Sequence, residues 1–380
     1  MRRLVAGLAF LLVACSQTTG KPTGQVTASA GVTPSPTLSA KGSGTANPSP
    51  TPDLPLSAVS FSCRLPVMRA STFGNYTGGF VTFPAATFAA DPRGGITSNS
   101  QNGVLTTIAT PALSGNLALY GPPFYDAAQR RWVPVDSGQS TADGAFYAYE
   151  TWDSANVTQA QVHVVNVAQA TEKTFVVAVP ANAQGFTVAD FDAAGVYLMA
   201  NTFEHLPSGV WLMDSTNGTL RQVTQVGPVA AVRSGYAWLS TIDPHDPSPP
   251  QLRRSGTASD SIVRFDLASG AQTTWFYRPG MEVSLIGFAS AGRPIVYIED
   301  PSGSTDLSET WLSGGPGSNG TLVYSGRQPY IVSPQGDGDR IWFGGYTGIY
   351  MYTQSHGLQK VVAFNDLQPQ ESVLPAGFCM

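Results

Sequence analysis

The side chains that could do chemistry in this sequence are carboxylates, histidines and a few aromatic residues in polar stretches between apolar segments. Together these stretches supply one set of candidates for a binding face: Glu150, Trp152, Asp153, Glu204, His205, Asp243, His245, Asp246, Glu299, Asp300 and Tyr346. Two carboxylates about 5–10 Å apart across a cleft can act as acid and base on a glycosidic bond. The same side chains can also hold a ligand without reacting with it. Spacing along the chain leaves both chemistries open.

The densest of these stretches is Asp243-Pro244-His245-Asp246-Pro247. Carboxylates and imidazole are ligand types that divalent ions accept. Two prolines in five residues, however, restrict the backbone so strongly that the side chains would rarely converge on one ion. We therefore expect a rigid, protruding turn here, and we predict neither a metal site nor a cofactor.

Other motifs that carry chemistry are absent from the sequence or stand in the wrong context. The run Gly315-Pro316-Gly317-Ser318-Asn319-Gly320 has the glycine spacing of a dinucleotide-binding loop, but a strand-like segment follows it. Phosphate binding of that kind requires a helix N-terminus at this point. The sequence has no nucleophile elbow, no His-Glu-x-x-His and no metal-type cysteine spacing. Only four histidines occur, and His163 falls in a strand-like segment, so we expect no nucleophilic triad.

Charge and composition narrow the classes of partner. The formal net charge is −5 and only 12% of the residues are charged, so we expect no basic surface for nucleic acid. The 40 glycines and 29 prolines are typical of short strands joined by many turns. After the N-terminal region, no apolar segment approaches the roughly 20 residues that a membrane-spanning helix needs.

The first fifteen residues have the organisation of an export signal. Met1-Arg2-Arg3 is positively charged, and the apolar run from Leu4 to Ala14 is too short for a mature membrane helix. Leu12-Val13-Ala14-Cys15 resembles the bacterial lipobox. That resemblance implies that residues 1–14 are a removed signal peptide and that Cys15 carries a lipid. We therefore expect anchoring at the extracytoplasmic side of a bacterial cell membrane, with an ordinary secretory signal as the alternative.

Residues 15–56 combine the predicted lipidated cysteine with a linker rich in Ser, Thr and Pro. After Cys15 this segment has no aromatic residue and few charges, so it cannot bury enough apolar surface to offset the entropy cost of ordering. We predict a disordered tether there and a folded domain over residues 57–380.

Two cysteines remain after Cys15, and they lie near the two ends of the predicted domain: Cys63 and Cys379. Export would place them in an oxidising compartment, where disulfides persist. We predict that they are bonded, which would stabilise the domain by on the order of 5 kcal/mol in the chain-entropy description. Two buried thiols are the alternative.

A repeated pattern runs through the predicted domain. Tight turns that contain glycine precede strand-like segments of aromatic and β-branched residues, as at Gly144, Gly195 and Gly235. Hairpin turns fall near residues 128, 169, 217, 269, 318 and 356, about 38 to 52 residues apart. Two hairpins per repeat are typical of four-stranded blades around an axis. We predict an all-β, six-bladed β-propeller, with a seventh blade left open within residues 57–118 and a pair of β-sandwiches as the alternative fold.

Two of the turns support this fold by resemblance. Ser333-Pro334-Gln335-Gly336-Asp337-Gly338 and Ser140-Thr141-Ala142-Asp143-Gly144 resemble the Ser-Pro-Asp-Gly-anchored repeats of TolB-like and WD40-like propellers, over roughly residues 136–364. In a propeller, the loops between the second and third strands of each blade lie on one face, where the candidate residues above would gather.

We expect a monomeric, non-catalytic surface lipoprotein whose propeller binds a protein, a peptide or a cell-wall glycan. Its only expected membrane contact is the lipid anchor. The alternative is an exported propeller hydrolase or lyase that acts on a polysaccharide, with paired carboxylates drawn from Glu150, Glu204, Asp243 and Glu299. The fold alone does not decide between these functions, because propellers host both.

Overall fold

Antiparallel strands joined by tight turns make up almost all of the described chain in the computed structural model. The structure describes residues 54–71, 76–98, 105–107, 123–152, 158–202, 207–242, 259–300, 307–318, 320–327, 332–368 and 371–380. Contacts divide the chain into two units, Met1–Ser49 and Pro50–Met380, and only the second contains described residues. The predicted signal peptide, Cys15 and the linker up to residue 53 therefore lie outside the described residues.

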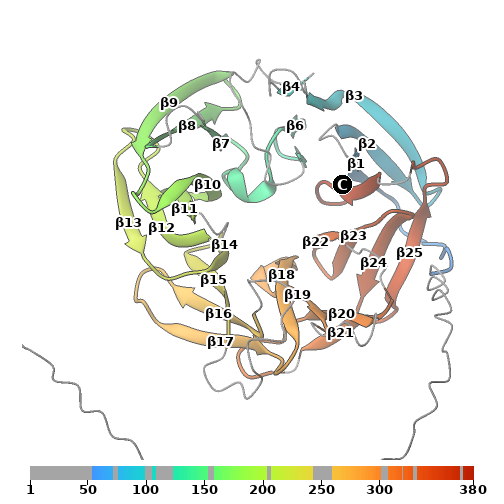
Figure 1. Cartoon of the computed structure of the whole chain (residues 1–380). Coiled ribbons are helices and arrows are strands. Elements are labelled where there is room, and N and C mark those ends of the chain that lie inside the picture. Colours follow the sequence, from blue (N-terminus) through green and yellow to red (C-terminus); the bar gives the residue numbers. More distant parts are fainter. Residues whose placement is uncertain are drawn as a thin grey trace, which may run out of the picture. The chain divides into compact units, whose positions relative to one another are not determined.

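The described strands form six blades, each a sheet of at least three strands, and Figure 1 shows them around a common axis. Blade one contains β1 (Cys63–Ala70), β2 (Tyr76–Phe83), β3 (Thr87–Ser98), β4 (Leu105–Thr107) and the C-terminal β26 (Ser372–Pro375). Blade two contains β7 (Phe146–Trp152), β8 (Gln159–Asn166) and β9 (Thr171–Ala178), preceded by the 3-10 helix η1 (Ser137–Gln139). Blade three contains β10 (Ala183–Asp192), β11 (Gly195–Thr202), β12 (Pro207–Met213) and β13 (Leu220–Thr224).

The remaining blades follow in chain order. Blade four contains β14 (Val229–Arg233), β15 (Tyr236–Thr241), β16 (Ser261–Asp266) and β17 (Gln272–Tyr277). Blade five contains β18 (Glu282–Phe288), the 3-10 helix η3 (Ser290–Gly292), β19 (Pro294–Glu299), β20 (Leu307–Leu312) and β21 (Thr321–Arg327). Blade six contains β22 (Val332–Asp337), β23 (Arg340–Gly344), β24 (Gly348–Thr353) and β25 (Gly357–Ala363), and a parallel contact between Phe288 and Gln335 joins it to blade five.

The predicted all-β propeller is confirmed, but one of its predicted blades is assigned differently. The hairpin near residue 128 is a separate two-stranded sheet of β5 (Phe124–Asp126) and β6 (Arg131–Val133) in the described residues. It lies between blade one and blade two in the ring (Figure 1). Blade one consists instead of strands within residues 63–107 together with β26, which supplies its innermost strand from the C-terminal end of the chain. The sequence pattern of residues 63–107 alone is therefore less regular.

Local turn chemistry explains the regular hairpins. At the turn after β12, the side chain of Asp214 accepts a hydrogen bond of 2.7 Å from the backbone N–H of Thr216, and Gly218 adopts a φ of 76°. At the turn after β16, Asp266 accepts a bond of 2.8 Å from the N–H of Ser269, and Gly270 has a φ of 75°. Aspartate side chains that bond their own following backbone favour such turns, and glycine tolerates positive φ without strain.

The two ends of the described chain close the ring. Strand β26 pairs antiparallel with β1, so that Ala70 faces Ser372 and Val67 faces Pro375. The predicted disulfide between Cys63 and Cys379 is confirmed, with 5.6 Å between the two Cα atoms. Closure of this kind removes the exposed strand edge that would otherwise invite aggregation.

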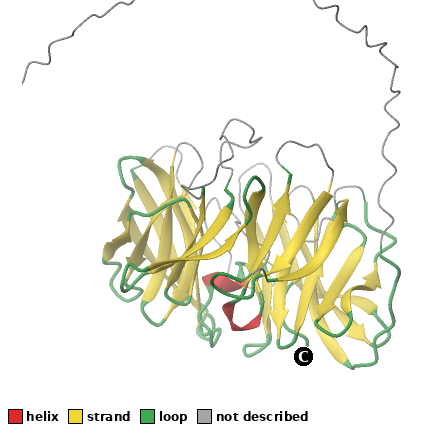
Figure 2. Cartoon of the chain, turned by 90° about the horizontal axis from the view of Figure 1, so that it is seen from below, coloured by secondary structure: helices red, strands yellow, loops and turns green. Residues whose placement is uncertain are grey.

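The ring has two faces with different connections, which we call the loop face and the turn face. One strand of each of blades two to six ends at the loop face, from which the chain leads to the next strand outward, and the strands that end there are β7, β11, β15, β19 and β23. The opposite turn face carries the tight turns, the 3-10 helices and the C-terminus, which lies at the lower edge of Figure 2. Within the described part of the chain, no helix is long and apolar enough to cross a membrane.

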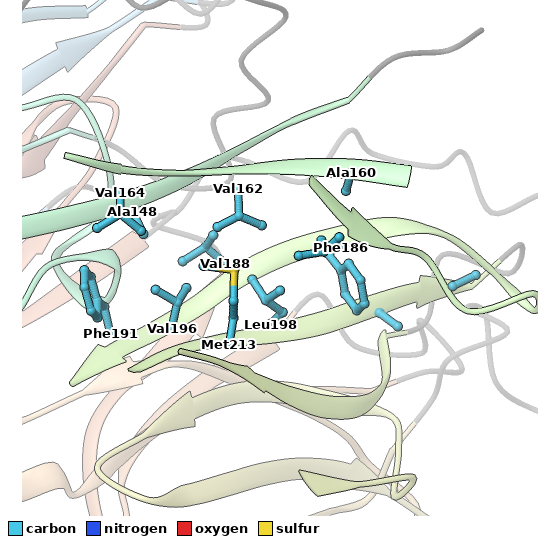
Figure 3. Packing of buried hydrophobic residues seen from close by; sticks show 13 residues of the cluster. Ala148, Ala160, Val162, Val164, Phe186, Val188, Phe191, Val196, Leu198 and Met213 are labelled. Carbon is cyan, nitrogen blue, oxygen red and sulfur yellow. The ribbon is translucent and has the colours of Figure 1, made fainter. Parts of the chain in front are cut away.

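Apolar side chains fill the spaces between neighbouring blades. Between blades two and three, Val162 and Ala148 meet Val188, Leu198 and others of one buried cluster (Figure 3). Each fully buried side chain of this size contributes about 1.5–3 kcal/mol relative to exposure. The contacts run from blade to blade, so they fix the positions of the strand ends from which the loops begin.

Two buried tryptophans act as packing residues in the ring. Trp342 is fully buried where blade six meets blade one, and its ring centre lies 5.6 Å from that of Phe83. Trp132 of β6 is also buried, and its Nε1 donates a 3.2 Å hydrogen bond to Asp91.

Candidate functional site

The structure describes only part of the predicted binding face. Six of the candidate residues lie outside the described residues: Asp153, Glu204, His205, Asp243, His245 and Asp246. The backbone of Trp152 ends β7 at the loop face. The candidates whose side chains are described are Glu150, Glu299, Asp300 and Tyr346.

Three of these four lie at the loop face. Glu299 is the last residue of β19 and is exposed, and Asp300 follows it directly. Tyr346 follows β23 and is 44% exposed. It stands next to Gly345, whose backbone exchanges hydrogen bonds of 2.9 and 3.0 Å with Val373 of the closing strand. The loop face thus presents acidic groups on blade five and an aromatic ring on blade six.

A second carboxylate, that of Glu282, lies opposite Glu299. Glu282 was not among the candidates predicted from the sequence. Glu282 begins β18, the innermost strand of blade five, and is directly opposite Glu299 in the antiparallel register. Directly opposite residues have Cβ atoms about 4.5–5.5 Å apart. The hydroxyl of Tyr297 donates a 3.5 Å hydrogen bond to Glu299 Oε2. The residue types alone could not reveal this pairing, because it depends on the register between the two strands.

Glu150 does not belong to an exposed loop, which corrects the prediction. It lies within β7 and is only 4% exposed. Its Oε2 accepts a 3.0 Å hydrogen bond from the backbone N–H of Val188 in blade three, and its Oε1 has no protein partner. Burial raises the pKa of Glu150 to about 8, with the Val188 bond opposing the shift. The strand continues past Glu150, so alternation turns this side chain toward the neighbouring blade.

Glu150 is one of three carboxyl groups near β10 whose pKa is raised. Burial raises the pKa of Asp190 to about 6, and its side chain accepts a 3.0 Å hydrogen bond from the N–H of Ser234 in blade four. Desolvation also raises the pKa of Asp136, which caps η1 by accepting from the N–H of Gly138 at 2.9 Å. Each carboxyl group binds a backbone N–H, and Glu150 and Asp190 do so at different blade boundaries. This arrangement holds blades together and does not form an acid–base pair.

The capping position of Asp136 could have been predicted from the sequence, because Gln139 follows it at the spacing of a capping box. The Oε1 of Gln139, three residues later, accepts a 3.0 Å hydrogen bond from the N–H of Asp136, which completes a capping box. The amide of Gln139 also donates a 3.2 Å hydrogen bond to the carbonyl of Val188. Gln139 and Glu150 therefore satisfy both backbone groups of Val188 from blade two.

His163 lies in a strand, as predicted, but it also takes part in a hydrogen-bonded chain across blade two. Its Nδ1 is 2.7 Å from Glu172 Oε1, and its Nε2 is 2.9 Å from Thr151 Oγ1. The Tyr149 ring stacks on the imidazole at 4.4 Å, and its hydroxyl donates a 2.9 Å bond to Glu172 Oε2. A carboxylate, an imidazole and a hydroxyl in this order resemble a nucleophilic relay. His163 and Thr151 are buried, however, so the chain primarily satisfies polar groups within the sheet.

Metal binding finds no support among the residues that the structure describes. No group of three or more His, Cys, Asp or Glu side chains in that part of the chain is arranged to hold a metal ion. The stretch from Asp243 to Pro247 lies outside it.

Neither a protein-family model nor a curated protein sequence matches the chain. Its fold is similar to that of solved structures at low identity. Oligogalacturonate lyase in complex with manganese is 10% identical, with a TM-score of 0.43 over 79% of this chain and 79% of that chain. The β-propeller domain of the Trilobed protease from Pyrococcus furiosus is 9% identical, with a TM-score of 0.41 over 80% of this chain and 86% of that one.

TolB from Acinetobacter baumannii is 12% identical, with a TM-score of 0.33 over 83% of this chain and 65% of that chain. At these identities and TM-scores, the likeness carries neither an activity nor a ligand over to this chain.

Proposed function

We propose that this chain is a lipoprotein anchored through Cys15 on the extracytoplasmic side of a bacterial cell membrane, and that its propeller is a non-catalytic binding module. The lipobox-like Leu12-Val13-Ala14-Cys15 and the tether after it support the anchor. The loop face receives a protein, a peptide or a cell-wall glycan. The chain works as a monomer.

The observation that carries this proposal is the pairing of Glu282 with exposed Glu299 at the loop face. Two carboxylates on neighbouring strands have fixed relative positions, because the sheet holds both backbones. Preorganised polar groups of this kind lower the entropy cost of binding. The exposed ring of Tyr346 on the next blade adds apolar contact area to the same face.

The position of Glu150 favours binding over catalysis. A propeller hydrolase or lyase using Glu150, Glu204, Asp243 and Glu299 would need its carboxylates around one cleft. Glu150 is buried against blade three and bonded to the backbone of Val188, so it does not share a solvent-open cleft with exposed Glu299.

The test is retention of envelope components by the full chain. Wild type and the loop-face variant Glu282→Gln/Glu299→Gln/Tyr346→Ala are incubated with membrane and cell-wall extract, and bound protein and glycan are quantified. A matched variant, Asp143→Asn/Asp192→Asn/Phe146→Ala, removes the same charges and one aromatic ring at the turn face. We expect the loop-face variant alone to lose a specific component.

Two outcomes would oppose the proposal. Equal retention by all three proteins would move the binding site away from the loop face. Time-dependent cleavage of a polysaccharide by wild type would establish catalysis in place of binding.

A further inference from the structure

Arginines and aromatic rings gather at the turn-face end of the boundary between blades four and five. Arg233 ends β14 and is directly opposite Tyr236, the first residue of β15. Arg264 lies in β16 and Trp275 in β17, both in blade four. From blade five, Phe288 ends β18 and Arg293 stands just before β19. We call Arg233, Arg264 and Arg293 the arginine cluster.

Arg264 lies between two aromatic rings. Its guanidinium carbon is 4.5 Å from the ring centre of Tyr236 and 4.3 Å from that of Trp275. A second tryptophan, Trp238, packs edge-on against Trp275 with 5.2 Å between ring centres. Cation–π contacts fix a guanidinium without using its N–H donors. Arg264 therefore has a defined position and keeps its hydrogen-bonding capacity.

The site is rich in donors and poor in acceptors. Within the described residues, Arg264 has no hydrogen-bond acceptor, and the buried Nε1 of neighbouring Trp275 has no partner. Arg293 uses its Nε to donate a 3.1 Å bond to the carbonyl of Ser313, and Arg233 lies over the ring of Phe288 at 5.1 Å. Buried or constrained donors normally have partners. The Nε1 of Trp275 departs from this rule, and the half-buried guanidinium beside it offers further donors that a ligand can use.

No carboxylate forms an ion pair with the arginine cluster in the part of the chain that the structure describes. Arg69, Arg93 and Arg340 each form an ion pair, whereas the three cluster arginines form none there. Asp266 attracts Arg264, and Asp136 and Asp190 attract Arg233, but only at longer range. Each of these carboxyl groups accepts a backbone N–H instead: Asp266 from Ser269, Asp136 from Gly138 and Asp190 from Ser234. Three arginines without a direct ion pair among the described residues therefore gather at one boundary of a chain whose formal net charge is −5.

We propose that the arginine cluster binds the carboxylates of an acidic polysaccharide, at a site separate from the loop face. Planar guanidinium groups pair with carboxylates through two parallel N–H···O bonds. The half-buried rings of Tyr236, Trp275 and Phe288 provide apolar surface for the C–H faces of sugars. Several neighbouring arginines can bind several carboxylates at once, as a polymer with one carboxylate per repeat unit would present them.

The test measures binding of alginate, a polymer of uronic acids, to the purified full chain at low ionic strength. Replacing Arg264 by Gln should raise the Kd about tenfold, because a charge-assisted bidentate contact is lost. Arg264→Lys should restore little of the affinity, since lysine keeps the charge but not the planar fork. Arg233→Gln, at an exposed position, serves as a second variant if Arg264→Gln does not fold.

The matched control is Arg221→Gln, which removes one exposed arginine from β13 in blade three. It should change the Kd less than about threefold, the range expected for a screened surface charge. Equal loss of affinity in Arg221→Gln and Arg264→Gln would overturn the proposal, as would equal binding of neutral dextran. Tighter binding of polyphosphate than of alginate would overturn the assignment to carboxylates. Loss of alginate binding by Arg264→Gln with intact loop-face binding would separate the two sites.

Discussion

The backbone N–H of Val188 in blade three donates a 3.0 Å hydrogen bond to the carboxyl group of Glu150 in blade two. A charged acid was expected at the binding face, but this one is enclosed between blades, with its second oxygen lacking a protein partner. Its protonation is therefore linked to how firmly the two blades hold together, which makes the stability of the propeller dependent on pH.

Glu150 should lower the stability of the fold as the pH rises. Burial raises its pKa from 4.5 to about 8, so within this window the folded state holds a proton that the unfolded state has released. From this one group, the free energy of unfolding should fall by up to about 1.4 kcal/mol per pH unit. Glu150→Gln should flatten that slope, as measured by urea unfolding at several pH values. Glu299→Gln, at an exposed position, is the control, and a slope unchanged in Glu150→Gln would refute the linkage.

The disulfide should be a large contributor to stability because it closes almost the whole domain. Cys63 and Cys379 are 316 residues apart, and replacing both by Ser should lower the free energy of unfolding by on the order of 5 kcal/mol. The single change Cys63→Ser should cost about as much, since either change breaks the bond. Two titratable thiols in the folded wild-type chain, beyond any at Cys15, would show that the bond is absent.

The His163 chain should stabilise blade two without conferring reactivity. His163→Phe keeps a ring against Tyr149 but removes the imidazole that bonds to buried Thr151 and to Glu172, which should cost about 1–3 kcal/mol in unfolding experiments. Thr174→Val removes only one peripheral hydroxyl of the same chain and should cost less. Because Thr151 is buried, a fluorophosphonate probe should not label it. Labelling that disappears in Thr151→Val would contradict the non-catalytic function.

Much of the fold could be predicted from the sequence because hairpin turns are local. Asn217-Gly218 and Ser269-Gly270 lie at the turns where the structure places them, since the aspartates before them bond to the turn backbone. Blade one was not recognised as a complete blade, because β26 reaches β1 from the far end of the chain. No short-range pattern encodes that contact.

The candidate sites were harder to predict because they depend on register and on which way a side chain faces. In β7, Tyr149 and Thr151 turn toward His163, so Glu150 between them turns to the other side and toward blade three. This alternation can be predicted from the sequence if the strand is taken to continue to Trp152. The arginine cluster and its rings could not be predicted from the sequence, because five strands and a turn of two blades must come together to form the site.

The anchor should depend on a single residue. In wild-type cells, labelled palmitate should enter the protein and the protein should sediment with membranes. Cys15→Ala should abolish the label and either release the protein into the medium or leave it unprocessed, because a lipidated cysteine is what holds it. Cys63→Ser/Cys379→Ser should keep the label. Equal palmitate incorporation in wild type and Cys15→Ala would exclude this anchor.

Site-specific photocrosslinking in intact cells measures which face of the propeller meets a partner. A photoreactive phenylalanine analogue replaces Tyr346 at the loop face in one strain and Asp339, an 88% exposed turn-face residue of blade six, in another. We predict a discrete crosslinked species from position 346 that disappears when Glu282 and Glu299 are both changed to Gln, and none from position 339. A crosslink from position 339 with none from position 346 would contradict binding at the loop face.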